Sequence, residues 1–195
     1  EMGEADGVLM FDESGFVKKG KFSAGVAHQY CGTIGKVANC QVGVFMGYAS
    51  RQGYTLVDKR LFFPEQWFEQ GYADTRKKCQ VPEELDFRSK PQYAAEMLLQ
   101  CYQQGILPFT YIVADTLYGN SLDFIEAAEK CIGKTYFVSM PLDTQCWLQR
   151  PLTTTKTYRY KGELRTKRLL KAPKKDPLTF EQFATGLHEH FWYKR

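Results

Sequence analysis

Short apolar runs bounded by turn residues predict five β-strands along this chain. The runs are rich in β-branched and aromatic residues, and they cover residues 8–12, 39–50, 54–63, 109–114 and 135–140. Arg51-Gln52-Gly53 suits a hairpin turn between the second and third runs. Glu13-Ser14-Gly15 is a turn signal after the first. The first third of the chain is therefore predicted to be an antiparallel meander.

Two amphipathic helices are predicted between and after these strands. The first covers about Lys90 to Gln104, because four apolar residues follow the spacing of one buried helix face and Gly105 ends the pattern; they are Ala94, Met97, Leu98 and Cys101. The second covers Leu122 to Cys131, with Ser121 as a candidate N-cap. Residues 64–70 begin with a proline that suits a first helical position, and residues 72–91 are predicted to be a loop with short turns.

The order of these elements predicts an α/β fold. Three meander strands are followed by helix, strand, helix and strand, and helical connections make the later strands parallel neighbours. This is the order of the RNase H-like fold, a mixed five-stranded sheet with flanking helices. We assign residues 1–142 to this core.

The character of the sequence changes after Pro141, and we assign residues 143–195 to a separate basic subdomain, which the family resemblance described below implies is the start of a β-rich insertion. Residues 153–160 favour a strand but offer little to bury. Seven of the 15 residues from 161 to 175 are Lys or Arg, which makes this run a candidate for phosphate contact or for solvated surface. Residues 178–190 predict a short helix.

Composition sets limits on the class of protein. The 195 residues are 44% hydrophobic and 25% charged, which is ordinary for a globular protein, and the formal net charge is +4. A mildly basic chain is compatible with nucleic-acid binding without requiring it. None of the six cysteines forms a C-x-x-C pair, so we expect free thiols and no zinc site. No apolar run reaches the roughly 18 residues that a membrane helix needs.

Asp12 and Asp115 are the candidate catalytic and metal-binding residues. Each follows an apolar run predicted to be a buried strand, and burying an unpaired carboxylate is costly. Two such strands side by side would bring two like charges together, and a divalent cation would neutralise both. Mg²⁺ prefers carboxylate oxygens, and two such ions support phosphodiester chemistry. The alternative is that each Asp simply caps a turn or a helix.

A basic loop is predicted beside this candidate metal site. Lys18, Lys19 and Lys21 flank a glycine shortly after Asp12, and they are candidates for DNA phosphate contact or a solvated surface. Residues 32–37 only superficially resemble a phosphate-binding loop, because the first glycine and the final Ser or Thr are missing. The pair His188 and His190 is weak evidence for a metal.

Two segments carry a resemblance to a known family. Residues 11–50, beginning FDESGFVKKGKFS, resemble the opening of the catalytic domain of DDE-type insertion-sequence transposases, the DDE superfamily endonucleases. Residues 113–120, VADTLYGN, resemble the family's second-acid motif. The resemblance implies an RNase H-like fold, cleavage and strand transfer of DNA at transposon ends, and a two-metal site for Mg²⁺ or Mn²⁺ in which Asp12 and Asp115 are the first two acids.

The resemblance also implies DNA partners, both transposon ends and target, a homodimer in a synaptic complex, and a cytoplasmic, nucleoid-associated prokaryotic protein with no membrane association. The family's third acid, a Glu on a late helix, has no match here. We therefore expect it beyond Arg195 and expect this chain, as a fragment, to be catalytically incomplete. The alternatives are a catalytically inactive RNase H-like DNA-binding or interaction module, and another RNase H-like nuclease such as a resolvase.

Overall fold

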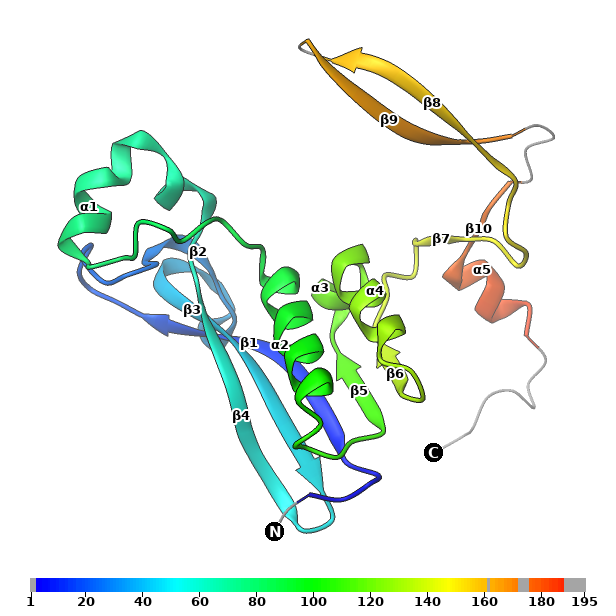
Figure 1. Ribbon diagram of the computed structural model, residues 1–195, viewed down its shortest axis with the longest axis horizontal. Helices are drawn as coiled ribbons and strands as arrows, with labels where there is room; N and C mark the ends of the chain where they lie inside the picture. The colour runs from blue at the N-terminus through cyan, green and yellow to red at the C-terminus, as the bar shows by residue number, and fades with distance from the viewer. Residues whose placement is uncertain (1–2, 161, 172–175, 188–195) are drawn as a thin grey trace. The chain divides into compact units, whose positions relative to one another are not determined.

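The computed structural model describes residues 3–160, 162–171 and 176–187 (Figure 1). The chain divides into two compact units, Glu1–Met140 and Pro141–Arg195, which we describe separately. The first unit is built on one mixed sheet of six strands: β1 (Val8–Val17), β2 (Ala27–Cys31), β3 (Lys36–Ser50), β4 (Gly53–Phe62), β5 (Tyr111–Ala114) and β6 (Thr135–Val138).

The strand order confirms the predicted α/β class with a mixed sheet. β3 pairs antiparallel with β1 and with β4, while β1, β5 and β6 are parallel neighbours. The five predicted strands thus lie in the order β4-β3-β1-β5-β6. The sixth strand, β2, was not predicted. It has five residues of which two are buried, and it pairs with Lys36 to Cys40 at the start of β3.

The turn predicted at Glu13-Ser14-Gly15 is wrong, because β1 continues through these residues to Val17. The cause is the partner strand. β3 is 15 residues long and pairs with every residue of β1, so its hydrogen bonds outweigh the local turn preference. On the other side, β5 pairs with β1 only as far as Phe11. The second half of β1 therefore extends beyond β5.

Four α-helices and three 3-10 helices complete the first unit. They are η1 (Gly32–Ile34), η2 (Glu65–Phe68), η3 (Gln70–Tyr72), α1 (Ala73–Lys78), α2 (Lys90–Gln104), α3 (Thr116–Gly119) and α4 (Leu122–Lys130). The boundaries predicted for α2 are confirmed. A capping box between Ser89 and Gln92 begins this helix, and Gly105, at φ 63°, ends it in the left-handed conformation that glycine adopts without strain.

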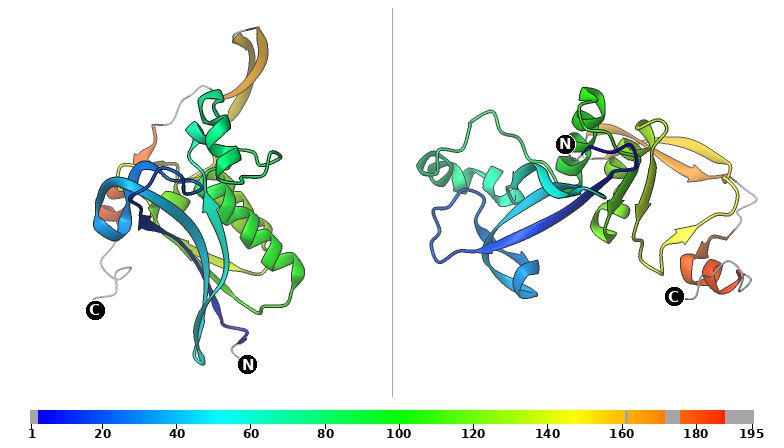
Figure 2. Two further views of the ribbon diagram at one scale, coloured as in Figure 1. Left: turned by 90° about the vertical axis from the view of Figure 1, so that its left-hand side faces the viewer. Right: turned by 90° about the horizontal axis from the view of Figure 1, so that it is seen from below.

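The main core lies between α2, α4 and one face of the sheet (Figures 1 and 2). Alternation along β1 places Leu9 and Phe11 in this core, where Phe11 makes an edge contact with Phe124 of α4. Met10, between them, faces the opposite side and is 38% exposed. Burial of such large apolar side chains stabilises the unit by about 1.5–3 kcal/mol each.

A second cluster forms around the fully buried Trp67 of η2. Its indole Nε1 donates to the carbonyl of Val26 at 2.9 Å, and its ring contacts Phe63. Val81 closes the cluster. The segment predicted to be a loop, residues 72–91, thus contains α1, and its Val81 packs in the cluster around this tryptophan.

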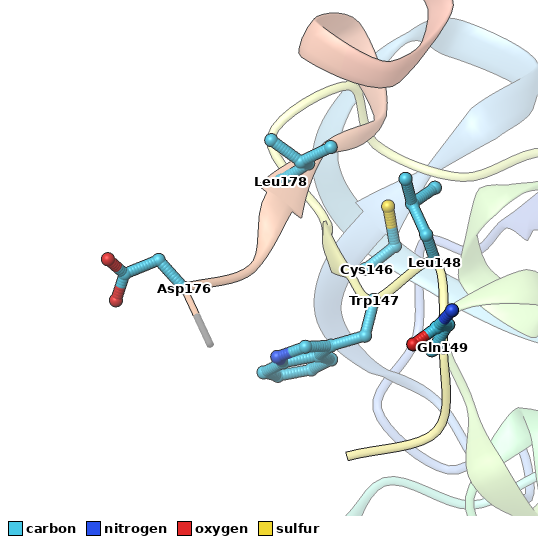
Figure 3. A pocket seen from close by; sticks show the side chains of 6 residues that line it. All are labelled: Cys146, Trp147, Leu148, Gln149, Asp176 and Leu178. Atoms are coloured by element: carbon cyan, nitrogen blue, oxygen red, sulfur yellow. The ribbon is translucent and has the colours of Figure 1, made fainter. Parts of the chain in front are cut away.

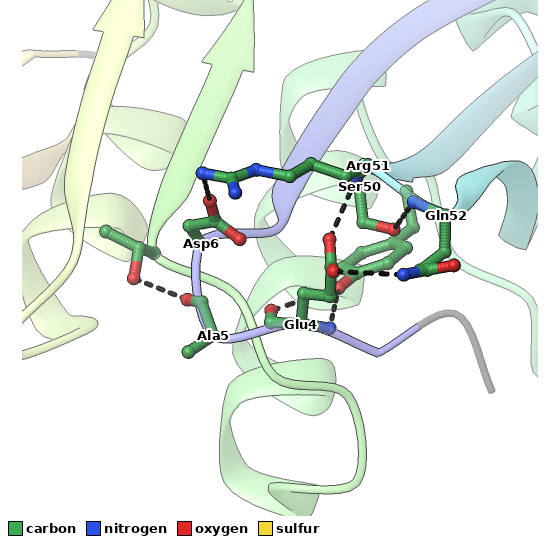
Figure 4. Close-up of polar contacts among 8 residues, drawn as sticks. Glu4, Ala5, Asp6, Ser50, Arg51 and Gln52 are labelled. Atoms are coloured by element: carbon green, nitrogen blue, oxygen red, sulfur yellow. Dashed lines mark hydrogen bonds and ion pairs between the residues drawn. The ribbon is translucent and has the colours of Figure 1, made fainter.

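The N-terminal segment is held against the β3–β4 turn and the start of β5 (Figure 4). The Glu4 carboxylate accepts from the backbone N–H of Arg51 at 2.9 Å, and Asp6 pairs with the Arg51 side chain at 3.2 Å. The hydroxyl of Thr110 donates to the carbonyl of Ala5 at 2.7 Å. These contacts fix the entrance to β1, and with it the register of the strand that carries Asp12.

The second unit consists of small, separate elements: β7 (Gln145–Cys146), β8 (Thr153–Tyr160), β9 (Glu163–Leu170), β10 (Leu178–Thr179) and α5 (Phe180–Thr185). β7 pairs with β10, and β8 pairs with β9. The helix predicted for residues 178–190 is observed as α5, and the end of that range lies outside the described residues. Among the described residues, no helix is both long and apolar enough to span a membrane.

Candidate active site

The parallel pairing of β1 with β5 brings Asp12 and Asp115 to the same place in the sheet. Phe11 of β1 pairs with Ala114 of β5; Asp12 directly follows Phe11, and Asp115 directly follows Ala114. Neighbouring strands lie about 4.8 Å apart. Asp12 continues β1 on the open face of the sheet, and Asp115 is the N-cap of α3. Both residues are exposed, so the expectation of buried carboxylates is wrong: the helices cover only the other face.

Each aspartate accepts a hydrogen bond at its Oδ1 atom from a backbone N–H one or two residues further along the chain. Asp12 Oδ1 accepts from the N–H of Glu13 at 2.7 Å, and Asp115 Oδ1 accepts from the N–H of Leu117 at 2.9 Å. The alternative interpretation, that Asp115 caps a helix, is therefore correct as far as it goes. It does not exclude a second role, because the hydrogen bonds found among the described residues use only Oδ1 of each carboxylate.

The charge around Asp12 favours a protonated carboxyl or a bound cation. Partial burial raises the pKa of Asp12 above its ordinary value of 3.8, the Glu13 N–H opposes this, and the negative charges of Glu13 and Asp115 raise the pKa further. Lys90 acts in the opposite direction. The pairing of Phe11 with Ala114 makes the two aspartates neighbours across the strands, so their charges interact. A cation between them would remove this repulsion.

A polar group beneath the sheet supports the site, and the sequence did not predict it. Glu13 points to the helical face, where its carboxylate pairs with Lys90 Nζ at 2.9 Å and accepts from the Tyr118 hydroxyl at 2.8 Å. Burial, together with the charges of Glu13, Asp12 and Asp115, raises the pKa of Tyr118 far above its ordinary value. The phenol therefore stays protonated and donates to Glu13, which links α2 and α3 to β1 beside Asp12.

Alternation along β1 was the available signal for this group. Adjacent strand residues point to opposite faces, so the pair Asp12-Glu13 must place one acid on each side of the sheet. Lys90 and Tyr118 lie 77 and 105 residues further along the chain, and no local pattern connects them to Glu13.

Gly119 lets α3 approach β6 closely. A Cβ at this position would lie 2.2 Å from the carbonyl oxygen of Ser139 and 3.0 Å from the side chain of Val138. Only glycine fits without moving backbone atoms. The glycine of the VADTLYGN segment thus fixes the position of α3, and Asp115 is the N-cap of that helix.

The predicted basic loop is present, but its distance from Asp12 is larger than expected. Lys18 follows the end of β1, so six residues of extended strand separate it from Asp12 by about 20 Å. The Asn39 amide donates to the carbonyls of Lys18 and Gly20 at 2.8 and 3.0 Å, which fixes the loop backbone. Lys19 and Lys21 are exposed. Contact of these lysines with DNA stays a prediction.

The donor set at Asp12 and Asp115 fits a hard divalent cation in part. Carboxylate oxygens are suitable ligands for Mg²⁺ or Mn²⁺, and the two neighbouring aspartates offer such oxygens. Among the described residues, no group of three or more His, Cys, Asp or Glu side chains could hold a metal ion. A cation at this place would take two ligands from the aspartates, and water or further groups would complete its shell.

Other candidate sites carry less chemistry. All six cysteines are free, as predicted. A pocket of about 280 Å³ in the second unit lies beside β7 and β10 and contains one thiol and one carboxylate, without a nucleophile and base in hydrogen-bonding contact (Figure 3); it is lined by Cys146, Trp147, Leu148, Gln149, Asp176 and Leu178. His188 and His190 lie outside the described residues.

Comparison with known proteins gives one family. A family model described as "DDE superfamily endonuclease" matches residues 1–194. No curated protein and no solved structure matches the chain. The family match covers both units, including the β8–β9 segment.

Proposed function

Because the chain belongs to the DDE superfamily endonuclease family, we propose that it carries the first two metal-binding acids of a DNA transposase, Asp12 and Asp115. The family establishes a nuclease or transposase type of function, and its members generally use divalent metals. The proposal adds that the reaction is cleavage and strand transfer at transposon ends, that Mg²⁺ or Mn²⁺ is the metal, and that the DNA is held in a homodimeric synaptic complex.

The observation that carries this proposal is the register of β1 against β5. It brings two carboxylates to equivalent positions of neighbouring strands although 103 residues separate them in sequence. Partial burial, with the negative charges of Glu13 and Asp115, raises the pKa of Asp12, and this costs stability unless a cation or proton is bound. Repulsion between two carboxylates gives no advantage to a site with a purely structural role, whereas a cation bound between them offsets it.

The residues of the chain have distinct roles in this proposal. Asp12 and Asp115 bind the cation through carboxylate oxygens, and a divalent ion bound there supplies Lewis acidity for phosphodiester chemistry. Glu13 holds β1 against α2 and α3 through Lys90 and Tyr118. It acts by positioning Asp12, since its own carboxylate faces the helices.

Titration with Mn²⁺, followed by calorimetry, tests the metal assignment. We expect saturable binding by the wild-type chain and its loss in Asp12→Asn and in Asp115→Asn. Asn keeps the size of the side chain and its hydrogen-bond acceptor, so the fold is retained. Asp143→Asn, in the second unit, is the matched control and should bind like the wild type. Equal Mn²⁺ binding by the wild type and both site variants would contradict the assignment.

A second candidate function is a catalytically inactive RNase H-like module that binds DNA or a protein partner. The observation that favours it is the finding of two, and not three, converging acids among the described residues. Nicking of supercoiled plasmid in Mn²⁺ separates the two functions. Nicking that is lost in both aspartate variants supports the transposase; a wild-type chain that binds no Mn²⁺ supports the inactive module.

A further inference from the structure

The β8–β9 hairpin concentrates the positive charge of the chain. Residues 153–170 contain six of the 26 Lys and Arg residues and one of the 22 Asp and Glu residues. Their net charge is therefore +5, whereas the chain as a whole carries +4, so the remaining residues sum to −1. The mildly basic character of this protein is a property of one hairpin.

The hairpin has no core of its own. Every residue of β8 is exposed, as are the first six residues of β9, and only Leu169 and Leu170 are partly buried. An isolated two-stranded hairpin in water is at best marginally stable. This one also places Lys156 directly opposite Lys167, and like charges in that arrangement are destabilising. Intramolecular packing thus gives no reason for this sequence.

Binding to a polyanion explains why this exposed hairpin carries so many positive charges. Residues directly opposite each other in an antiparallel pair share a face, so Lys156, Lys167 and Tyr158 lie on one face of the hairpin. Arg165 is on the same face but is already engaged, by Glu163 at 3.2 Å and by the ring of Tyr160 at 5.0 Å. The lysine pair therefore carries the uncompensated charge at the centre of that face.

The dimensions of the β8–β9 ribbon favour duplex DNA over duplex RNA. A two-stranded ribbon fits the major groove of B-form DNA, which is about 12 Å wide, whereas the major groove of A-form RNA is too narrow for side chains to read. Each strand of this ribbon, which is drawn in Figure 1, has eight residues and spans about 27 Å, or about eight base pairs. Threonines on both faces add hydroxyl donors for phosphate oxygens.

We propose that the β8–β9 ribbon binds the major groove of duplex DNA, with Lys156 and Lys167 contacting phosphate groups. This surface is separate from the carboxylate pair and needs no metal. Binding through phosphates is independent of base sequence, so the ribbon holds DNA without selecting a transposon end.

The test is fluorescence anisotropy with a 20-base-pair DNA duplex of arbitrary sequence, in EDTA so that no cleavage occurs. The variant Lys156→Gln/Lys167→Gln should bind at least about fivefold more weakly near 0.1 M salt, and the slope of log K against log[salt] should fall by about 1.8, for two phosphate contacts. Since the substitution also removes the opposed charges, the ribbon should not be destabilised; amide hydrogen exchange of residues 153–170 checks this directly.

Two control variants make the result specific. Lys77→Gln/Lys130→Gln removes the same charge from exposed positions of the first unit and should leave the affinity within about twofold of the wild-type value. Lys156→Arg/Lys167→Arg keeps the charge and should also retain binding. Unchanged affinity in the Gln ribbon variant, or an equal loss in the first-unit control, would overturn the proposal.

Two further measurements test the partner and separate this inference from the proposed function. An RNA duplex of the same sequence should compete less well than DNA, and equal competition would overturn the assignment to the B-form groove. Asp12→Asn should bind the DNA duplex as the wild type does. Loss of Mn²⁺ binding with intact duplex binding, or the reverse, shows which of the two assignments fails.

Discussion

Replacement of Asp12 by Asn should stabilise the protein in the absence of divalent cations. The pKa of Asp12 is raised in the folded state, so the ionised carboxylate costs stability at any pH above that raised value. The cost shrinks as the pH falls through the folded-state pKa, and it is absent below the ordinary value of 3.8, where the carboxyl is protonated in both states. Asn keeps the shape and the acceptor for the Glu13 N–H without the charge.

The size of this effect follows from the exposure of the site. Interactions between exposed charges are worth about 0.2–1 kcal/mol, and for a chain of this length 1 kcal/mol corresponds to roughly 2–4 °C in Tm. We expect Asp12→Asn to melt about 1–3 °C above the wild type at pH 7 in EDTA. The difference should diminish when the same comparison is made near pH 4.

Mn²⁺ should reverse the order of stability. A ligand that binds only the folded state at ten times its Kd stabilises that state by about 1.4 kcal/mol, which raises the wild-type Tm by roughly 3–5 °C. The variant lacks one ligand and should gain less. Differential scanning calorimetry in EDTA and in MnCl₂ measures both effects, with Asp143→Asn as the control. An Asn variant that is less stable in EDTA at pH 7, or that gains as much from Mn²⁺ as the wild type, would refute the reasoning.

Three further substitutions test the parts that position the site. Asp115→Ala should cost about 1 kcal/mol more than Asp115→Asn in urea unfolding, because only Asn can still cap α3; equal losses would argue against the cap. Tyr118→Phe should cost about 1 kcal/mol by removing the donor to Glu13, and an unchanged midpoint would show that this bond contributes little. Gly119→Ala should cost about 1–3 kcal/mol, since its Cβ would meet the Ser139 carbonyl oxygen at 2.2 Å; normal stability would mean that α3 can shift freely.

Local features of the sequence were sufficient for the elements that form through near neighbours. α2 was predicted from its apolar spacing and from Gly105, and both depend on contacts within a few residues. β5 and β6 were predicted from short β-branched and aromatic runs, and the helices between the strands indicated parallel pairing. The positions of Asp12 and Asp115 at equivalent points of two adjacent strands followed from these predictions.

Other features depended on partners far away in the chain. β1 continues through Glu13-Ser14-Gly15 because β3 supplies hydrogen bonds along its whole length, and a turn signal of three residues cannot include that contribution. The same applies to β2, whose five residues form a strand only against the start of β3. Cross-strand pairing is a property of two segments, so neither segment alone predicts it.

The sequence by itself determined that one acid, Asp12, follows the apolar run that begins β1 and that another, Asp115, follows the run that forms β5. Asp12 is followed by a second acid, Glu13, and only the tertiary structure decided which of these two faces the helices. The helices cover the side of Glu13 and leave the side of Asp12 open. The physical reason is that strand alternation separates the two acids but does not say which side will be packed. That choice is made by α2 and α4, whose apolar faces bury Leu9 and Phe11 and so turn Asp12 to the open side.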